Sequence, residues 1–151
     1  MTPFPDACPS GHPKNSQRMK KNEYMEKNLA FLEEMRQKEG VSELRGGVLY
    51  EVMKTGDGQG TVSPRSIVTC HYKGMLISGK VFDNSYERHC PEAFRVNELI
   101  SGFQIGLLGM HIGDQWRAYI PSEMGYGSRG AGRDIPGHST LIFEIELLGI
   151  G

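Results

Sequence analysis

The spacing of the apolar residues changes from helical to extended at Gly46-Gly47, and this change limits the folds open to the chain. Between Lys20 and Lys38 the apolar residues recur near a period of 3.6, with charged residues between them; they are Tyr24, Met25, Leu29, Leu32 and Met35. After Gly46-Gly47 the apolar residues alternate in short runs separated by glycine and proline. The pattern predicts an amphipathic helix that stops near Gly40, followed by a sheet of short strands.

The segment from Leu141 to Leu148 is the clearest strand in the sequence. The residues expected on its inward face are Leu141, Phe143, Ile145 and Leu147, with two glutamates on the other face. Further strands are predicted at 48–53, 67–77, 93–96 and 116–120. The strand at 67–77 is expected to break at Gly74, and Pro121 ends the one at 116–120.

One short helix is predicted among these strands. Asn97 can cap a helix that runs from Glu98 to about Leu108. Leu99, Phe103 and Leu107 would share one of its faces. Many short strands with one short helix imply an α+β fold, in which a curved antiparallel sheet wraps around that helix.

The chain has 151 residues, enough for one domain with a substantial core and too few for two. Residues 1–19 are rich in proline and are expected to form a flexible tail. Residues 20–45 are assigned to the N-terminal helix and a linker, and residues 46–151 to the folded domain. The apolar stripe of the helix must pack on the domain or on a second copy of the chain, and the sequence leaves both open.

Charge and cysteine content narrow the classes of partner and compartment. The net charge of −1 gives no general attraction to nucleic acid or to a membrane surface. Cys8, Cys70 and Cys90 have no regular spacing, which favours a reducing compartment over a disulfide framework. No apolar run approaches the roughly 20 residues that span a bilayer. Residues 1–6 show no signal peptide, so a cytoplasmic location is expected, or a periplasmic one if a signal preceded this sequence.

Two blocks, residues 68–85 and 119–147, place aromatic and aliphatic side chains at many separated points, with few catalytic polar residues among them. This composition is typical of an apolar pocket rather than an acid-base site. No cofactor is expected, because the G-x-G-x-x-G spacing of 125–130 lacks a strand directly before it and a helix after it. No metal is expected either, since Cys8 and His12 are too few ligands for a site.

The two blocks resemble the FKBP family of peptidyl-prolyl cis/trans isomerases over about Gly46 to Gly151. The resemblance implies a cup between the concave sheet and the short helix, in which a proline-containing polypeptide binds. The catalytic positions that it implies are Phe82, Asp83 and Tyr126. The substrate-binding positions that it implies are Tyr72, Arg88, Phe94, Leu99, Ile100, Phe103, Ile135 and Phe143. In this scheme Arg88 braces Asp83, and Phe103 forms the floor where the family has a tryptophan.

Three further comparisons with the family concern the flap and the N-terminal segment. Arg129 to Arg133 stand where some members carry a flap histidine, and Ile135-Pro136-Gly137 replaces the usual Ile-Pro-Pro. Both differences predict a looser flap loop around Tyr126. Residues 28–41 resemble the linker of bacterial Mip-type FKBPs, which carry a longer dimerisation region, so a homodimer through residues 20–38 is one expectation.

The resemblance implies a prolyl isomerase that assists protein folding and binds tacrolimus- or rapamycin-like macrolides as inhibitors. An apolar pocket suits this reaction because the twisted amide at the barrier is less charge-separated than the planar amide. The alternative is a non-catalytic binding module for proline segments, or a holdase chaperone, that uses the same cup. On the residues alone, Tyr72, Phe103 and Phe143 could be core, and Asp83 a turn residue with little effect on stability.

Overall fold

The computed structural model of the chain describes residues 14–151, with side chains from Asn22 onward. The strands are β1 (Ser42–Glu43), β2 (Leu49–Lys54), β3 (Ile67–Met75), β4 (Val81–Asn84), β5 (Glu92–Arg95), β6 (Gln115–Ile120) and β7 (Leu141–Ile150). The helices are α1 (Lys14–Gln37) and α2 (Ser101–Leu108), with short 3-10 turns η1 (Arg45–Gly47), η2 (Val96–Glu98) and η3 (Ser122–Met124).

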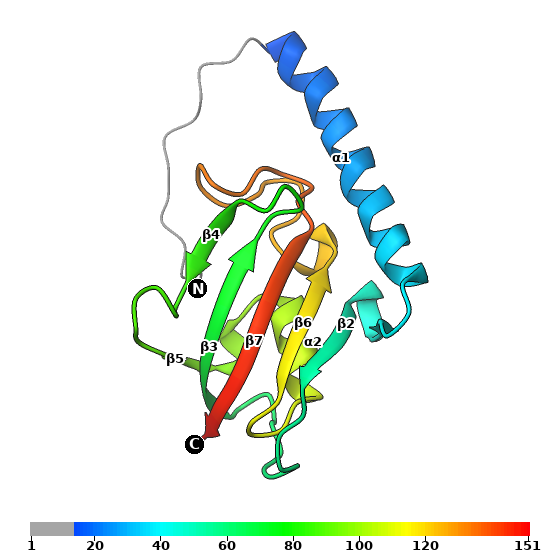
Figure 1. The fold of residues 1–151 in the computed structure, drawn as a ribbon. Coiled ribbons are helices and arrows are strands. Elements are labelled where there is room, and N and C mark those ends of the chain that lie inside the picture. Colours follow the sequence, from blue (N-terminus) through cyan, green and yellow to red (C-terminus); the bar gives the residue numbers. More distant parts are fainter. Residues whose placement is uncertain (1–13) are drawn as a thin grey trace.

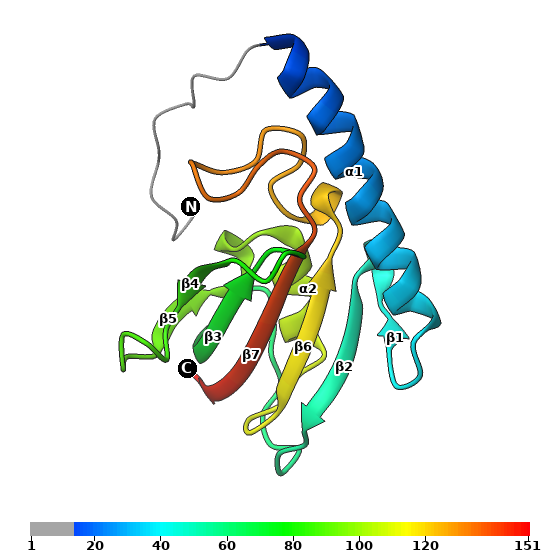
Figure 2. The same cartoon turned by 45° about the horizontal axis from the view of Figure 1, so that its top comes forward.

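All the strand pairs in the described residues are antiparallel and belong to one sheet, in the order β1-β2-β6-β7-β3-β4, with β5 also paired to β3. The sheet curves around α2 without closing into a barrel (Figure 1; Figure 2). The predicted α+β arrangement is therefore confirmed. The alternation of apolar residues was enough to predict this arrangement, since five of the strands were predicted close to their observed positions.

The N-terminal helix is present but begins earlier than predicted. α1 starts at Lys14, inside the segment predicted to be a tail. The physical reason is that Pro13 is the last proline of that segment, and the residues after it are compatible with a helix. Residues 1–13 of the predicted tail lie outside the described residues.

Two local predictions about the domain were wrong. Gly74 does not break β3, which runs through it to Met75. A Cβ on Gly74 would lie 2.6 Å from the Phe82 ring and 2.8 Å from the Phe143 ring, so the glycine makes room for two aromatic side chains. Asn97 does not cap a helix: it lies inside η2, and α2 begins only at Ser101 with Ile100 as its N-cap.

The strand β4 was not predicted, because its sequence Val-Phe-Asp-Asn is short and leads into turn residues. It becomes a strand through pairing with β3, where Asp83 lies opposite Gly74 and Asn84 opposite Lys73. The very short β1 escaped prediction for the same reason, since it exists only through its two pairs with β2.

The concave face of the sheet carries the main core. On β7, Leu141, Phe143, Ile145 and Leu147 are all buried, and they pack with Phe103 and Leu107 of α2. Residues of β3, β5 and β6 complete this cluster, including Tyr72, Phe94 and Ile120. Burying this face against α2 provides most of the hydrophobic stabilisation of the domain.

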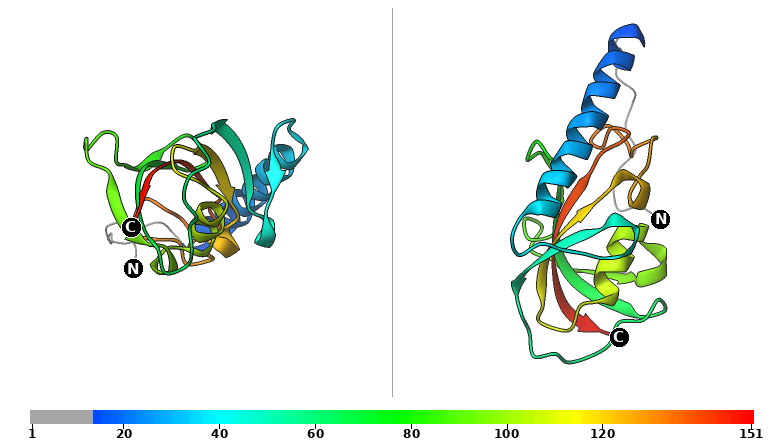
Figure 3. Two further views of the ribbon diagram at one scale, coloured as in Figure 1. Left: turned by 90° about the horizontal axis from the view of Figure 1, so that it is seen from below. Right: turned by 90° about the vertical axis from the view of Figure 1, so that its right-hand side faces the viewer.

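The convex face has a second, smaller apolar cluster, and α1 packs on it. Leu49, Tyr119 and Ile142 lie side by side on β2, β6 and β7, and Leu32 of α1 is buried against them. The ring centroids of Phe31 and Tyr119 are 5.9 Å apart. The stripe of α1 therefore packs on its own domain, while the N-terminal half of the helix projects past the sheet (Figure 3). Within residues 14–151, no helix is long and apolar enough to cross a membrane.

Candidate functional site

A cluster of five aromatic rings lies on the concave face between β3, β4, β5, β7 and α2. Phe103 of α2 is central to it, with its centroid 5.0 Å from Phe143, 6.0 Å from Tyr72 and 6.3 Å from Phe94. Phe82 of β4 packs edge-on against Phe143 at 5.6 Å. Most of these contacts are tilted or edge-to-face, which is the favourable geometry for aromatic pairs.

The burial of these rings shows how core and site overlap. Tyr72 and Phe143 are each 1% exposed, and Phe103 is 4% exposed, so all three belong to the hydrophobic core. Among the half-buried residues that pack against the same core are Phe82, Ile100 and Tyr126, which we call the rim residues. The three deep rings therefore form a rigid floor, and a ligand on this face would meet the rim residues first.

Asp83 joins the ring cluster to a charged edge. The hydroxyl of Tyr72 donates to Asp83 Oδ2 at 2.5 Å, and the Arg88 guanidinium donates to Asp83 Oδ1. Arg88 also pairs with Glu92 at 3.2 Å and lies over the Tyr72 ring at 5.9 Å. The side chain of Asp83 is only 8% exposed. The prediction that Asp83 has little effect on stability is therefore not supported, because it holds two partners in place.

These contacts fix the charge state of the group. Burial raises the pKa of Tyr72, and its hydrogen bond to the Asp83 carboxylate raises it further, so Tyr72 stays a neutral donor. The hydrogen bond to Asp83 raises the pKa of Arg88, which stays a cation. Burial raises the pKa of the Cys70 thiol to about 12, so this core cysteine is inert.

Ser85 supports this edge and was not singled out in the sequence. Its side chain is fully buried, and its hydroxyl accepts from Tyr72 N at 2.7 Å and donates to Tyr72 O at 3.2 Å. The same oxygen lies 2.8 Å from His71 Nδ1. Ser85 therefore fixes the backbone of Tyr72 where β4 ends. No periodic signal marks it, because it follows the strand in a turn.

The flap loop, residues 125–140, connects η3 to β7 and carries Tyr126 and Ile135. Ile135 is 1% exposed and belongs to the ring-bearing core, and Tyr126 packs against that core. Ala131 and Ile135 exchange two backbone hydrogen bonds of 2.8 and 3.2 Å, and Gly130 N donates to Tyr126 O. Lys80 forms an ion pair with Asp134 at 3.2 Å. The loop is thus held at several points, and the looser flap expected from its sequence stays a prediction.

The structure brings every predicted site residue to one region. Leu99 lies in the core cluster, and Ile100 is the residue at which α2 begins. An open depression of about 330 Å³ adjoins the cluster and is lined by Val81, Phe82, Asp83, Asn84, Glu87 and Arg88. Among the described side chains, no three His, Cys, Asp or Glu residues gather in a way that could hold a metal ion. The roles assigned to the individual site residues remain predictions.

The fold, the concave aromatic cluster and the sequence agree on one class of protein. The profile of the FKBP-type peptidyl-prolyl cis-trans isomerases matches residues 58–148. The chain belongs to the FKBP family. The chain is similar to the Mip protein of Coxiella burnetii. The two are 38% identical over 125 residues, which cover 83% of this chain and 54% of that protein. The resemblance to Mip-type members is therefore confirmed.

Two other relatives differ in how much of their length is matched. The chain is 44% identical over 123 residues to the FKBP-type 22 kDa peptidyl-prolyl cis-trans isomerase of Escherichia coli, covering 81% of this chain and 59% of that protein. It is 45% identical over 105 residues to the FK506-binding protein of Neisseria meningitidis, covering 68% of this chain and 95% of that protein. The chain thus spans little more than half the length of the Escherichia coli and Coxiella relatives.

A solved structure matches almost the whole chain. The peptidyl-prolyl cis-trans isomerase from Pseudomonas syringae has a TM-score of 0.80 and 32% identity, covering 95% of this chain and 99% of that one. The match therefore extends beyond the family domain into the N-terminal segment that contains α1.

Proposed function

We propose that this chain is a peptidyl-prolyl cis-trans isomerase that accelerates the rotation of X-Pro bonds during protein folding. The observation that carries the proposal is the deep aromatic floor with Phe82, Ile100 and Tyr126 at its rim and Asp83 held at its edge. The membership of the chain in a family named for this reaction supports it. Because the uncatalysed step takes tens to hundreds of seconds, a modest acceleration matters to folding.

The proposed mechanism uses the medium of the cup rather than a proton transfer. The planar amide has a barrier of roughly 18–20 kcal/mol and loses its resonance as it twists. An apolar surrounding disfavours the more polar planar state, so binding energy contributes to twisting. The amide of Ile100 lies at the N-terminus of α2, where backbone donors can hold a flanking carbonyl. We assign the hydroxyl of Tyr126 to a second such contact.

The test is an isomerisation assay on an X-Pro peptide, with a proline-limited refolding reaction as a second substrate. We expect a faster rate than the uncatalysed reaction, unchanged by a metal chelator. Tyr126→Ala, purified in parallel, controls for contaminating isomerases, since its preparation should be much less active. A wild-type chain that binds proline peptides without accelerating either reaction would instead support the non-catalytic binding module or holdase.

We also propose that tacrolimus-like macrolides bind the same cup. The FK506-binding protein of Neisseria meningitidis, 45% identical to this chain, carries such a ligand in its name. The pipecolyl ring of these compounds mimics proline, and Phe82, Phe103 and Tyr126 would contact it. We expect competitive inhibition of the isomerisation assay. Full activity at saturating macrolide would rule out this use of the cup.

We further propose a homodimer through residues 20–38 and a cytoplasmic location. Leu32 is already buried on its own domain, so a dimer would have to use apolar residues such as Leu29, which is 53% exposed. Sedimentation of the chain and of Leu29→Glu tests this, because only a dimer through α1 predicts a lower mass for the variant. The free thiols of Cys70 and Cys90 agree with a reducing compartment, and cell fractionation tests the location.

A further inference from the structure

Two polar contacts, one buried and one partly buried, join α1 to the end of the flap loop. Asn28 is 2% exposed, and its Oδ1 accepts a hydrogen bond of 2.7 Å from Thr140 N. Its Nδ2 donates to Tyr24 O at 2.8 Å, so both ends of the amide are satisfied. The hydroxyl of Tyr24 lies 2.7 Å from Ser139 Oγ, which itself donates to Pro136 O at 2.7 Å. Since the Ser139 proton is used there, Tyr24 is the donor to Ser139.

We call Tyr24, Asn28, Ser139 and Thr140 the latch. Asn28, Ser139 and Thr140 are 2%, 3% and 1% exposed, so the bond from Thr140 to Asn28 is shielded from water, while Tyr24 is half-buried. Removing Asn28 would leave the Thr140 amide buried without its partner, which is costly. An amide placed at this point of an otherwise apolar helix stripe fixes one position of α1 along the sheet, as buried polar groups can do.

The latch is connected to Tyr126 through the backbone of the flap loop. His138 N donates to Gly127 O at 2.9 Å, so the segment that leaves the loop is bonded to the residue next to Tyr126. A Cβ on Gly137 would lie 2.0 Å from Ser128 O, which shows how closely the two arms of the loop approach. Any displacement of Ser139 and Thr140 would therefore be passed to the arm that carries Tyr126.

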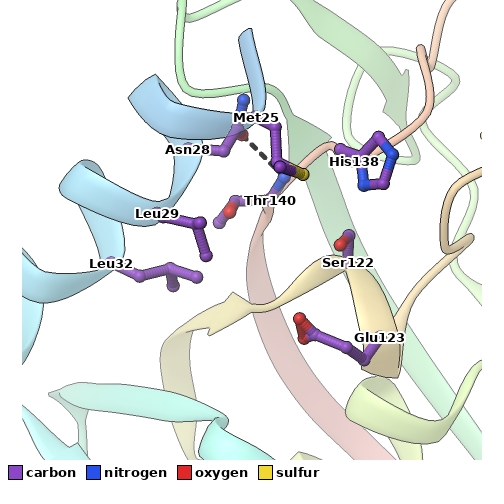
Figure 4. Close-up of a pocket in the computed structure, with 8 residues that line it drawn as sticks. All are labelled: Met25, Asn28, Leu29, Leu32, Ser122, Glu123, His138 and Thr140. Carbon is purple, nitrogen blue, oxygen red and sulfur yellow. Dashed lines mark hydrogen bonds between the residues drawn. The ribbon is translucent and has the colours of Figure 1, made fainter. Parts of the chain in front are cut away.

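The latch bridges a region where α1 and the root of the flap loop are not closely packed. A groove of about 140 Å³ separates the helix from the root of the flap loop (Figure 4). It is lined by Met25, Asn28, Leu29, Leu32, Ser122, Glu123, His138 and Thr140. A groove of this size has room for several waters, at about 30 Å³ each. Figure 4 shows Asn28 reaching across at its upper end to Thr140.

We propose that α1 is a positioning element for the flap loop, and that Asn28 and Tyr24 are its positioning residues. They hold residues 136–140 so that Tyr126 stays over the aromatic floor in a conformation ready for the substrate. This inference rests on the proposed isomerase function. It gives α1 a role in the reaction although the helix packs on the opposite face of the sheet from the ring cluster.

The test compares three single variants of the full chain. Asn28→Ala removes the bond to Thr140, and Tyr24→Phe removes only the bond to Ser139. Phe31→Ala is the matched control, because Phe31 packs α1 on Tyr119 without lining the groove. For each we would measure the melting temperature, kcat/KM for an X-Pro peptide, and the hydrogen exchange of the Gly130 and His138 amides.

We expect Asn28→Ala to speed exchange of both flap amides and to lower kcat/KM by about fivefold, the scale of a typical coupling between sites. Tyr24→Phe should do the same to a lesser degree, and it keeps the test valid if Asn28→Ala does not fold. Phe31→Ala should lower the melting temperature and leave both other readouts near wild type.

Two results would overturn the proposal. One is a lower melting temperature for Asn28→Ala and Tyr24→Phe with unchanged flap exchange and kcat/KM. The other is an equal loss of kcat/KM in Phe31→Ala, which would show that any loosening of α1 has this effect. If the wild-type chain itself shows no isomerisation, the proposed function fails, while the exchange measurements still decide whether the latch holds the flap.

Discussion

The two faces of the sheet are built from the same strands but serve different purposes. On the concave face, Phe143 lies between Ala118 and Gly74, and small neighbours leave space for large rings from β4 and α2. On the convex face, Ile142 lies between Tyr119 and Met75 in an apolar row that α1 covers. Two residues farther along β7 on each face, Ile145 continues the concave core, whereas Glu144 makes the convex face charged.

A charged row on the convex face borders the apolar row that α1 covers. Glu51, Arg117, Glu144 and Lys73 lie side by side across β2, β6, β7 and β3. Arg117 pairs with Glu144, and Tyr119 donates to Glu51. A helix could cover this row only by desolvating its ion pairs, which is costly. The concave face therefore forms the candidate site, while the apolar row of the convex face determines where α1, which carries the latch, packs.

The largest expected effect is the difference between truncating two adjacent residues of β7 that lie on opposite faces of the sheet. Phe143→Ala should destabilise the domain by about 3–5 kcal/mol and abolish activity, because it opens the aromatic floor. Ile142→Ala, on the opposite face, should cost about 2–3 kcal/mol and retain most of kcat/KM. Denaturant unfolding and the isomerisation assay on both variants measure this. Equal losses of activity would show that the two faces are not separable.

The second prediction concerns the edge of the concave face. Asp83→Ala should lower kcat/KM and also destabilise by about 1–3 kcal/mol, because Tyr72 and Arg88 lose their acceptor. In a Tyr72→Phe background the destabilisation should shrink, since one of the two donors is already gone. A double-mutant cycle by chemical denaturation measures the difference. Strict additivity would contradict the shared hydrogen-bond group.

The third prediction compares a tyrosine of each face. Tyr126→Ala should lower kcat/KM by about tenfold or more while costing about 1 kcal/mol of stability, because the side chain is half-buried on a loop and not inside the core. Tyr86 stacks on His71 and donates to Glu146 on the convex side, so Tyr86→Ala should reduce stability and leave kcat/KM unchanged. The reverse pattern would mean that Tyr126 does not contact the substrate.

The smallest effect at neutral pH belongs to Cys70, whose contribution to stability changes only at alkaline pH. Burial raises the pKa of Cys70 from 9.0 to about 12, so between these values the unfolded chain releases a proton that the folded chain keeps. Stability from this group is therefore complete below about pH 9 and falls as the pH rises toward 12. Denaturation midpoints across this range should fall less steeply for Cys70→Ala. An identical slope would assign the loss to other groups.

The sequence alone gave the class of fold because periodicity is a local property. The alternation in Leu141 to Leu148 and the helical spacing of residues 20–38 predict which side chains face a core. They do so without showing which other residues form that core. The deep rings could be chosen because Tyr72, Phe103 and Phe143 occur in the order and spacing of a family. In contrast, β4 is too short to show a periodicity of its own and becomes a strand only by pairing with the neighbouring β3. The role of Gly74 depends on Phe143, which is distant in the chain, so no local pattern could reveal it.

Tertiary structure decided what each face touches. The stripe of α1 could have packed on a second chain, and only the apolar row of Leu49, Tyr119 and Ile142 shows that the domain itself supplies its partner. Asp83 could have been a turn residue, and only its approach to Tyr72 and Arg88 makes it part of the site. Asn28 and Thr140 are 112 residues apart, and their hydrogen bond exists because the fold brings two buried polar groups within reach of each other. Sequence determines which groups must be buried, while the satisfaction of a buried polar group depends on partners that only the folded chain brings near.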